Sequence, residues 1–178
     1  MFMNYLSIGI SYLVISIPIA IILLLIYHGM KFLIVKKFNV TAPKILCQMA
    51  WIAIIISILG ITGIIGGDYT VTSLFQGTSQ FNFRIFDQGI NNATILNLVL
   101  FIPYGFLTPI IFEKIGKRRI YGVLIGLVFT LIIEFLQSFT GRFVELEDIL
   151  MNTLGTYIGY SISIALIRYK IKKANQCV

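Results

Sequence analysis

Five long apolar runs, separated by polar connections, dominate the chain. A helix needs roughly 20 apolar residues, at a rise of about 1.5 Å per residue, to cross the hydrocarbon of a bilayer. Each run approaches or exceeds that length. The pattern therefore predicts an all-α membrane helix bundle with five transmembrane helices, at about residues 5–27, 45–65, 93–112, 120–139 and 149–167.

Proline and glycine mark interruptions in this pattern. Pro18 is expected to kink the first helix, and Gly66-Gly67 is expected to end the second. No Lys or Arg precedes the first run, so we interpret it as a retained helix and not as a cleaved signal peptide. Residues 68–92 form the longest polar segment, where alternation at residues 81–85 fits either a short strand or an interfacial segment. We favour the interfacial segment.

The positions of the basic residues predict the orientation. Connections 31–44 and 113–119, together with the tail 168–173, hold twelve of the fourteen Lys and Arg residues. By the positive-inside rule these segments are cytoplasmic, so the N-terminus is outside and the C-terminus inside. Five of the seven acids then lie outside with residues 68–92 and 140–148.

Composition agrees with a membrane protein. The chain of 178 residues is 58% hydrophobic, 12% charged and has a mean hydropathy of +0.94, far from the soluble average. The net charge of +7 is explained by topology, so we expect membrane lipids as partners and no nucleic acid. Cys47, Cys177 and His28 show no metal-ligand spacing, so we expect neither metal nor cofactor.

The most unusual stretch is residues 141–155, where an Arg, three acids and an Asn adjoin apolar spans. Polar groups are costly in lipid, so they need a specific explanation. With the predicted orientation, Glu134 lies roughly 7 Å and Asn97 about 6 Å below the outer ends of their helices, and Asn152 lies at a similar depth. Three helices thus offer polar groups at one level, which predicts a small cavity that opens outward.

Helical spacing gathers small and polar residues into stripes on the last three spans. Gly122-x-x-x-Gly126 and Gly155-x-x-x-Gly159 allow close backbone approach, so we expect the fourth and fifth spans to pack together through them. In the third span, Pro103 is expected to bend the helix, with Gly105 on its polar face. The polar residues that we assign to the candidate site are Asn97, Glu134, Gln137, Arg142, Glu145, Asp148 and Asn152.

Two interpretations of these groups remain open. Asn and Gln side chains serve as interhelical hydrogen-bond partners as readily as they contact a ligand. Glu134, however, must be protonated, paired or wetted at its depth, and intramembrane acids are typically functional. Arg142 is its expected partner, whereas Asp148 either holds Arg142 or caps the fifth span.

These residues also carry a resemblance. The motif Asn97-Leu-Val-Leu-Phe-Ile-Pro-Tyr-Gly-Phe106, then Glu134-Phe-Leu-Gln137 and Gly141-Arg142, then Glu145-Leu-Glu-Asp148 and Asn152-Thr-Leu-Gly155, is similar in order and spacing to the VanZ-like family. Glu145 and Glu147 stand where the family more often has Asp. The division that follows is two N-terminal helices with the start of the outer segment at 1–79, a VanZ-like three-helix core at 80–167, and a basic tail at 168–178.

The resemblance implies a multi-pass protein of the cell membrane whose namesake lowers susceptibility to teicoplanin-type glycopeptide antibiotics. We expect a non-enzymatic, polar outer-leaflet site that binds or excludes an amphipathic molecule such as a lipoglycopeptide. An alternative is an intramembrane enzyme that acts on a lipid or a lipid-linked cell-wall intermediate, with Glu134 and Asp148 or Glu145 as acid and base. A third is a structural or partner protein, in which the stripes only pack helices.

Overall fold

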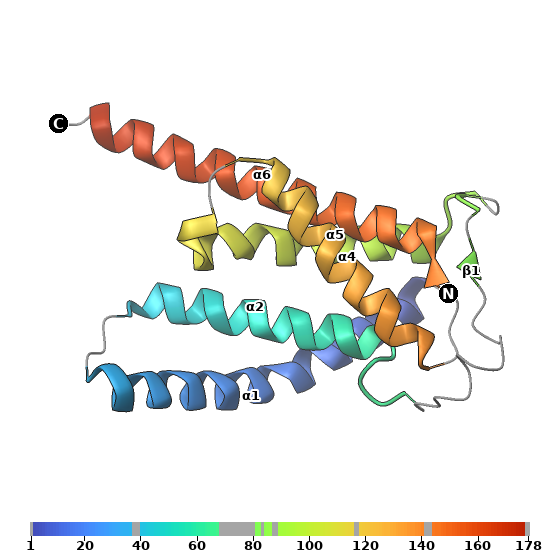
Figure 1. Ribbon diagram of the computed structural model, residues 1–178, viewed down its shortest axis with the longest axis horizontal. Coiled ribbons are helices and arrows are strands. Elements are labelled where there is room, and N and C mark those ends of the chain that lie inside the picture. The colour runs from blue at the N-terminus through green and yellow to red at the C-terminus, as the bar shows by residue number, and fades with distance from the viewer. Residues whose placement is uncertain are drawn as a thin grey trace.

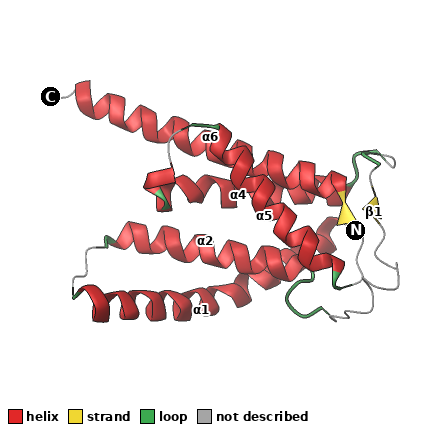
Figure 2. Ribbon diagram, viewed as in Figure 1, coloured by secondary structure: helices red, strands yellow, loops and turns green. Residues whose placement is uncertain are grey.

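A computed structural model describes residues 2–36, 40–67, 81–82, 84–86, 89–115, 118–140 and 144–176. Within them, five helices are long and apolar enough to cross a membrane, which confirms the predicted all-α architecture (Figure 2). The helices are α1 (Phe2–Val35), α2 (Ala42–Ile61), α4 (Asn92–Ile111), α5 (Ile120–Ser138) and α6 (Leu146–Gln176), with a 3-10 turn η1 (Glu113–Ile115) after α4.

The two ends of the bundle carry different segments (Figure 1). We call one the N-terminal end: it holds the start of α1, the residues after α2, and the starts of α4 and α6. We call the other the C-terminal end: it holds the α1–α2 and α4–α5 connections and the end of α6. The two termini of the chain therefore lie at opposite ends of the bundle.

Helix α6 is longer than its apolar run predicts. It has 31 residues and continues to Gln176 through the basic segment that we predicted to be a tail. Residues 168–176 contain neither Gly nor Pro, and most are good helix formers, so nothing in them stops the helix. Hydrophobicity marks where a helix can leave the lipid, not where the helix ends.

Helix α2 ends at Ile61, before the Gly66-Gly67 pair that we predicted to stop it. Gly63 has a φ of 76°, the left-handed conformation that glycine adopts without strain. The amide of Ile64 donates to the Leu59 carbonyl at 2.9 Å, and that of Gly63 to the Gly60 carbonyl at 3.0 Å. This is a Schellman motif, which satisfies the last carbonyls of the helix.

Glycines place α6 between α4 and α5. A Cβ at Gly122 or Gly126 would lie 2.8 Å from the Cβ of Tyr160 or Thr156, so these two glycines face α6 as predicted. Gly155 and Gly159 do not face α5, because a Cβ on either would collide with backbone carbonyls of α4. The expected pairing of the two glycine motifs is therefore wrong.

The close contact between α4 and α6 is reciprocal. A Cβ at Gly105 of α4 would meet the backbone of Thr156 on α6, while Gly155 and Gly159 meet the carbonyls of Leu98 and Ile102. Small residues at such crossings let two helix backbones approach closely, which strengthens packing where lipid offers no hydrophobic force between helices. This contact fixes α6 against the helix that bears Asn97.

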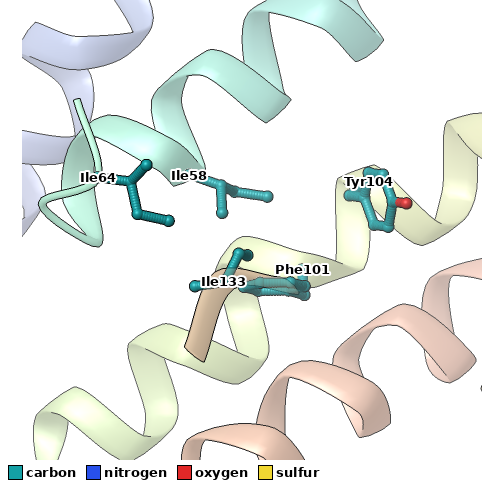
Figure 3. Close-up of a cluster of buried hydrophobic side chains, with 5 residues drawn as sticks. All are labelled: Ile58, Ile64, Phe101, Tyr104 and Ile133. Atoms are coloured by element: carbon teal, nitrogen blue, oxygen red, sulfur yellow. The ribbon is translucent and has the colours of Figure 1, made fainter. Parts of the chain in front are cut away.

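A cluster of buried side chains joins α2, α4 and α5 (Figure 3). Its members are Ile58, Ile64, Phe101, Tyr104 and Ile133. Trp51 extends the α2–α4 contact, since its ring stacks on Tyr104 at 5.9 Å and its Nε1 donates to the Thr108 hydroxyl at 3.1 Å.

Helix α1 packs against α2 through two polar contacts as well as apolar ones. The hydroxyls of Ser16 and Ser57 lie 3.1 Å apart, and Nε2 of His28 lies 3.0 Å from Oε1 of Gln48. Pro18 lies between these contacts, inside a helix that runs on to Val35. Much of the remaining α1 surface is apolar and exposed, as expected of a helix that faces lipid.

Candidate functional site

A cavity of about 750 Å³ lies between α1, α2 and α4 at the N-terminal end of the bundle. Its wall is mostly apolar, with Ile8 and Leu13 from α1, Ile54 from α2 and Leu100 from α4 among the lining residues. Ile8, Leu13 and Val99 are also substantially exposed. The cavity therefore opens sideways onto the surface that would face lipid.

One end of this cavity is polar. Four side chains from α4, α5, β2 and α6 line it together with Thr62, and they are Asn97, Gln137, Glu145 and Asp148. Along α2, the lining residues extend from Thr62 at the polar end to Ile54, a length of about 12 Å at 1.5 Å per residue. A polar end and a longer apolar wall make the cavity itself amphipathic.

Asn97 and Asp148 form the polar contact between α4 and α6. Nδ2 of Asn97 donates to Oδ1 of Asp148 at 2.6 Å. Asp148 lies in the first turn of α6, where the exposed amides of the helix favour an acid. Sequence spacing predicted that both residues face a shared site, and both line the cavity.

Gln137 connects α5 to the end of α2. Its Nε2 donates to the Thr62 carbonyl at 2.9 Å, and Thr62 is the residue that caps α2. Carbonyls at a helix end lack partners within the helix, so this bond satisfies one of them. Gln137 thereby holds α5 at the polar end while it lines the cavity.

Glu134 is buried, with 3% of its surface exposed, but it is not among the cavity-lining residues. Its Oε2 accepts a hydrogen bond from the backbone amide of Glu145 at 3.2 Å. Glu145 belongs to β2 (Val144–Glu145), which pairs in parallel with β1 (Phe81–Asn82). Glu134 thus positions the short strand that places Glu145 at the cavity.

Asn152 lies one turn further into the bundle than Asp148. It is 3% exposed, and its Nδ2 donates to the Thr130 hydroxyl of α5 at 3.0 Å. We predicted that Asn152, Glu134 and Asn97 form one polar floor. The structure instead divides them, because Asn97 lines the cavity whereas Asn152 joins α6 to α5 behind it.

Arg142, the predicted partner of Glu134, lies with Gly141 and Phe143 outside the described residues. Both charged side chains among the described lining residues are acidic, namely Glu145 and Asp148. Carboxylates accept hydrogen bonds, so the described part of the polar end suits hydroxyl, amide N–H or ammonium groups.

Glu147 and Thr94 were not among the residues that we assigned to the candidate site from the sequence. Glu147 accepts hydrogen bonds from the Thr94 hydroxyl and, at 3.2 Å, from the backbone amide of Phe86. Asn91 caps α4, with its Oδ1 accepting from the Thr94 amide at 3.0 Å. The Asn91-x-x-Thr94 spacing at a helix start was the available signal.

For residues 81–82 the structure shows the strand, the alternative that we did not favour.

The apolar wall of the cavity was also missed. Helices α1 and α2 carry about half of it, yet no individual Ile or Leu in a lipid-facing run signals a cavity. The predicted helix-packing residue Pro103 turns out to line the cavity as well.

Five apolar helices around a lateral, amphipathic cavity define a multi-pass membrane protein. Residues 45–168 match the model of the VanZ/LLP1 family, and this match covers more than half of the chain. The protein therefore belongs to the VanZ-like family, and the match takes in α2 as well as the three helices that carry the motifs. Comparison with curated proteins and with solved structures gave no match.

Proposed function

We propose that this protein binds an amphipathic molecule in the cavity between α1, α2 and α4. The observation that supports this most is the division of the cavity into an apolar wall and a polar end that carries Asn97, Gln137, Glu145 and Asp148. Its volume of about 750 Å³ is within the range of sites for small organic ligands. The apolar tail would lie along α1 and α2, and the polar part at the start of α6.

The positive-inside rule supports a location of this site in the outer leaflet of the cell membrane. Twelve of the fourteen Lys and Arg residues belong to segments of the C-terminal end, which would be cytoplasmic. The N-terminal end, where the cavity lies, would then face outward. An amphiphile that acts at the cell surface could enter sideways from lipid.

The family relationship favours a teicoplanin-type lipoglycopeptide as the molecule that is bound or excluded, and lowered susceptibility as the outcome. The acyl tail of such a drug suits the apolar wall, and its hydroxyl and amide groups suit the carboxylates of Glu145 and Asp148. Arg142, three residues before Glu145 in the sequence, is the predicted contact for an anionic part of the ligand.

Charge removal at the polar end tests this proposal. Glu145→Gln and Asp148→Asn keep the side-chain size but remove the acceptor charge at the cavity. In a susceptible bacterial host, at matched protein levels, we expect both variants to lose most of the protection against teicoplanin that the parent chain gives. Glu113→Gln, at the C-terminal end of the bundle, is the control and should keep it. Full protection by both polar-end variants would contradict the proposal.

The enzymatic alternative rests on the two carboxylates that line the same cavity. Glu145 and Asp148 could serve as acid and base toward a lipid-linked cell-wall intermediate, whereas Glu134 is not among the lining residues. Turnover of an undecaprenyl-type lipid by the purified protein, abolished by Asp148→Asn, would favour this function over simple binding. No turnover at any pH would exclude it for that class of substrate.

A further inference from the structure

A second cavity, of about 540 Å³, lies at the C-terminal end of the bundle, between α4 and α6. It lies far along both helices from the polar end of the first cavity. Apolar residues dominate its lining, including Phe106 and Ile110 of α4 and Leu166 of α6. Glu113 and Lys170 contribute the charged groups of its lining.

Two side chains in this cavity have polar atoms that the protein leaves available. Ser163 is 1% exposed, and its hydroxyl has no hydrogen-bond partner among the described residues. An unmade hydrogen bond in an apolar interior is costly, so a buried hydroxyl is normally satisfied. Lys170 lies at the exposed rim and forms no ion pair within the described part of the chain.

The acid at this rim is already neutralised. Oε1 of Glu113 lies 2.7 Å from Nζ of Lys44, which ties the 3-10 turn to the start of α2. The segments at this end hold twelve Lys and Arg residues against the single acid Glu113. An anionic group at the rim would therefore meet a positively charged surface and the Lys170 ammonium, which has no ion-pair partner among the described residues.

We propose that the cavity between α4 and α6 binds one anionic phospholipid of the leaflet at the C-terminal end, with Lys170 at its phosphate. Lys170 lies seven residues beyond Ser163 on α6, roughly 10 Å along the axis. The phosphate would thus lie at the rim, the Ser163 hydroxyl would bond a glycerol ester oxygen below it, and an acyl chain would fill the apolar floor. The site shares no lining residue with the first cavity and lies at the other end of the bundle.

Native mass spectrometry of the full chain tests this site. The protein is purified in a mild detergent with equal amounts of phosphatidylglycerol and phosphatidylcholine that carry the same acyl chains. We expect one phosphatidylglycerol to be retained in preference to phosphatidylcholine. Lys170→Gln should lower this retention about five-fold, the usual contribution of one basic side chain near an anionic lipid. Equal retention of the two lipids by the parent chain would overturn the proposal.

Matched variants separate the cavity from general charge attraction. Lys172→Gln removes a charge from the same helix at a residue that does not line the cavity, so it should leave retention unchanged. Leu166→Trp fills the exposed rim and should abolish retention. Leu154 is similarly exposed on α6 but lies outside the cavity, so Leu154→Trp should not abolish it. Equal losses from Lys170→Gln and Lys172→Gln, or from the two Trp variants, would contradict a defined site.

Discussion

The side-chain amide of Asn97 on α4 donates a 2.6 Å hydrogen bond to the carboxylate of Asp148 on α6, and both residues line the amphipathic cavity. The same pair therefore joins two helices and forms part of the polar end. The Asn97–Asp148 pair lies on the N-terminal side of the contact between Gly155 and the carbonyl of Leu98. The hydrogen bond between Asn97 and Asp148 thus contributes both to helix packing and to the candidate site.

The Asn97–Asp148 hydrogen bond should make a measurable contribution to the free energy of unfolding. A double-mutant cycle of Asn97→Leu and Asp148→Leu should give a coupling free energy of about 0.6–1.7 kcal/mol, from the average to the largest value for hydrogen bonds between membrane helices. The measurement is reversible unfolding in mixed micelles. A coupling of zero would mean that the two side chains contribute to stability independently.

The crossing of α4 and α6 should tolerate no added methyl group at Gly159. A Cβ there would collide with the Ile102 carbonyl, so Gly159→Ala should lower the free energy of unfolding by about 1–3 kcal/mol. Gly29→Ala is the control, because a Cβ added there would have nothing within 4 Å, and alanine should stabilise α1 by up to about 1 kcal/mol. Thermal unfolding of both variants in detergent makes the comparison.

Asn152 should act on stability and not on the cavity. Thr130→Val removes the hydroxyl that accepts from Asn152 and keeps the side-chain shape, so it should cost about 1–3 kcal/mol of unfolding free energy. Thr130→Ser keeps the hydroxyl and should recover most of that loss. Affinity for an amphiphile, measured on the folded fraction, should be the same in both. A change in affinity for Thr130→Val would show that the cavity extends to this pair.

The sequence predicts the number of spans and the residues of the polar end. It also predicts the limits of α2, α4 and α5 to within about four residues, whereas α1 and α6 extend well beyond the predicted ends of their spans. Length and hydrophobicity suffice for spans because lipid imposes one strong requirement on each helix. Periodicity likewise places Asn97, Gln137 and Asp148 on inward faces, and the structure brings them to one cavity. Polar residues are rare in these apolar helices, so their positions predict which helix faces point into the bundle.

The sequence does not show which helices and which side chains contact one another. Spacing shows that Gly155 and Gly159 share a face of α6, but not that this face meets α4 instead of α5. The end of α2 at Gly63 depends on one backbone conformation, which the more conspicuous Gly66-Gly67 pair obscured. Glu134 stands out by its depth, yet only the fold shows that it positions the backbone of Glu145.

Direct binding of teicoplanin to the protein in lipid nanodiscs tests the central claim most closely. Leu13 lines the cavity on α1, whereas Leu25 on the same helix is exposed but does not line it. If the acyl tail occupies the cavity, Leu13→Trp should weaken teicoplanin binding at least about ten-fold, and Leu25→Trp should leave it unchanged. Teicoplanin without its acyl tail should bind the parent chain weakly, with about the affinity that intact teicoplanin has for Leu13→Trp. Equal affinity of Leu13→Trp and the parent chain for teicoplanin would contradict the account.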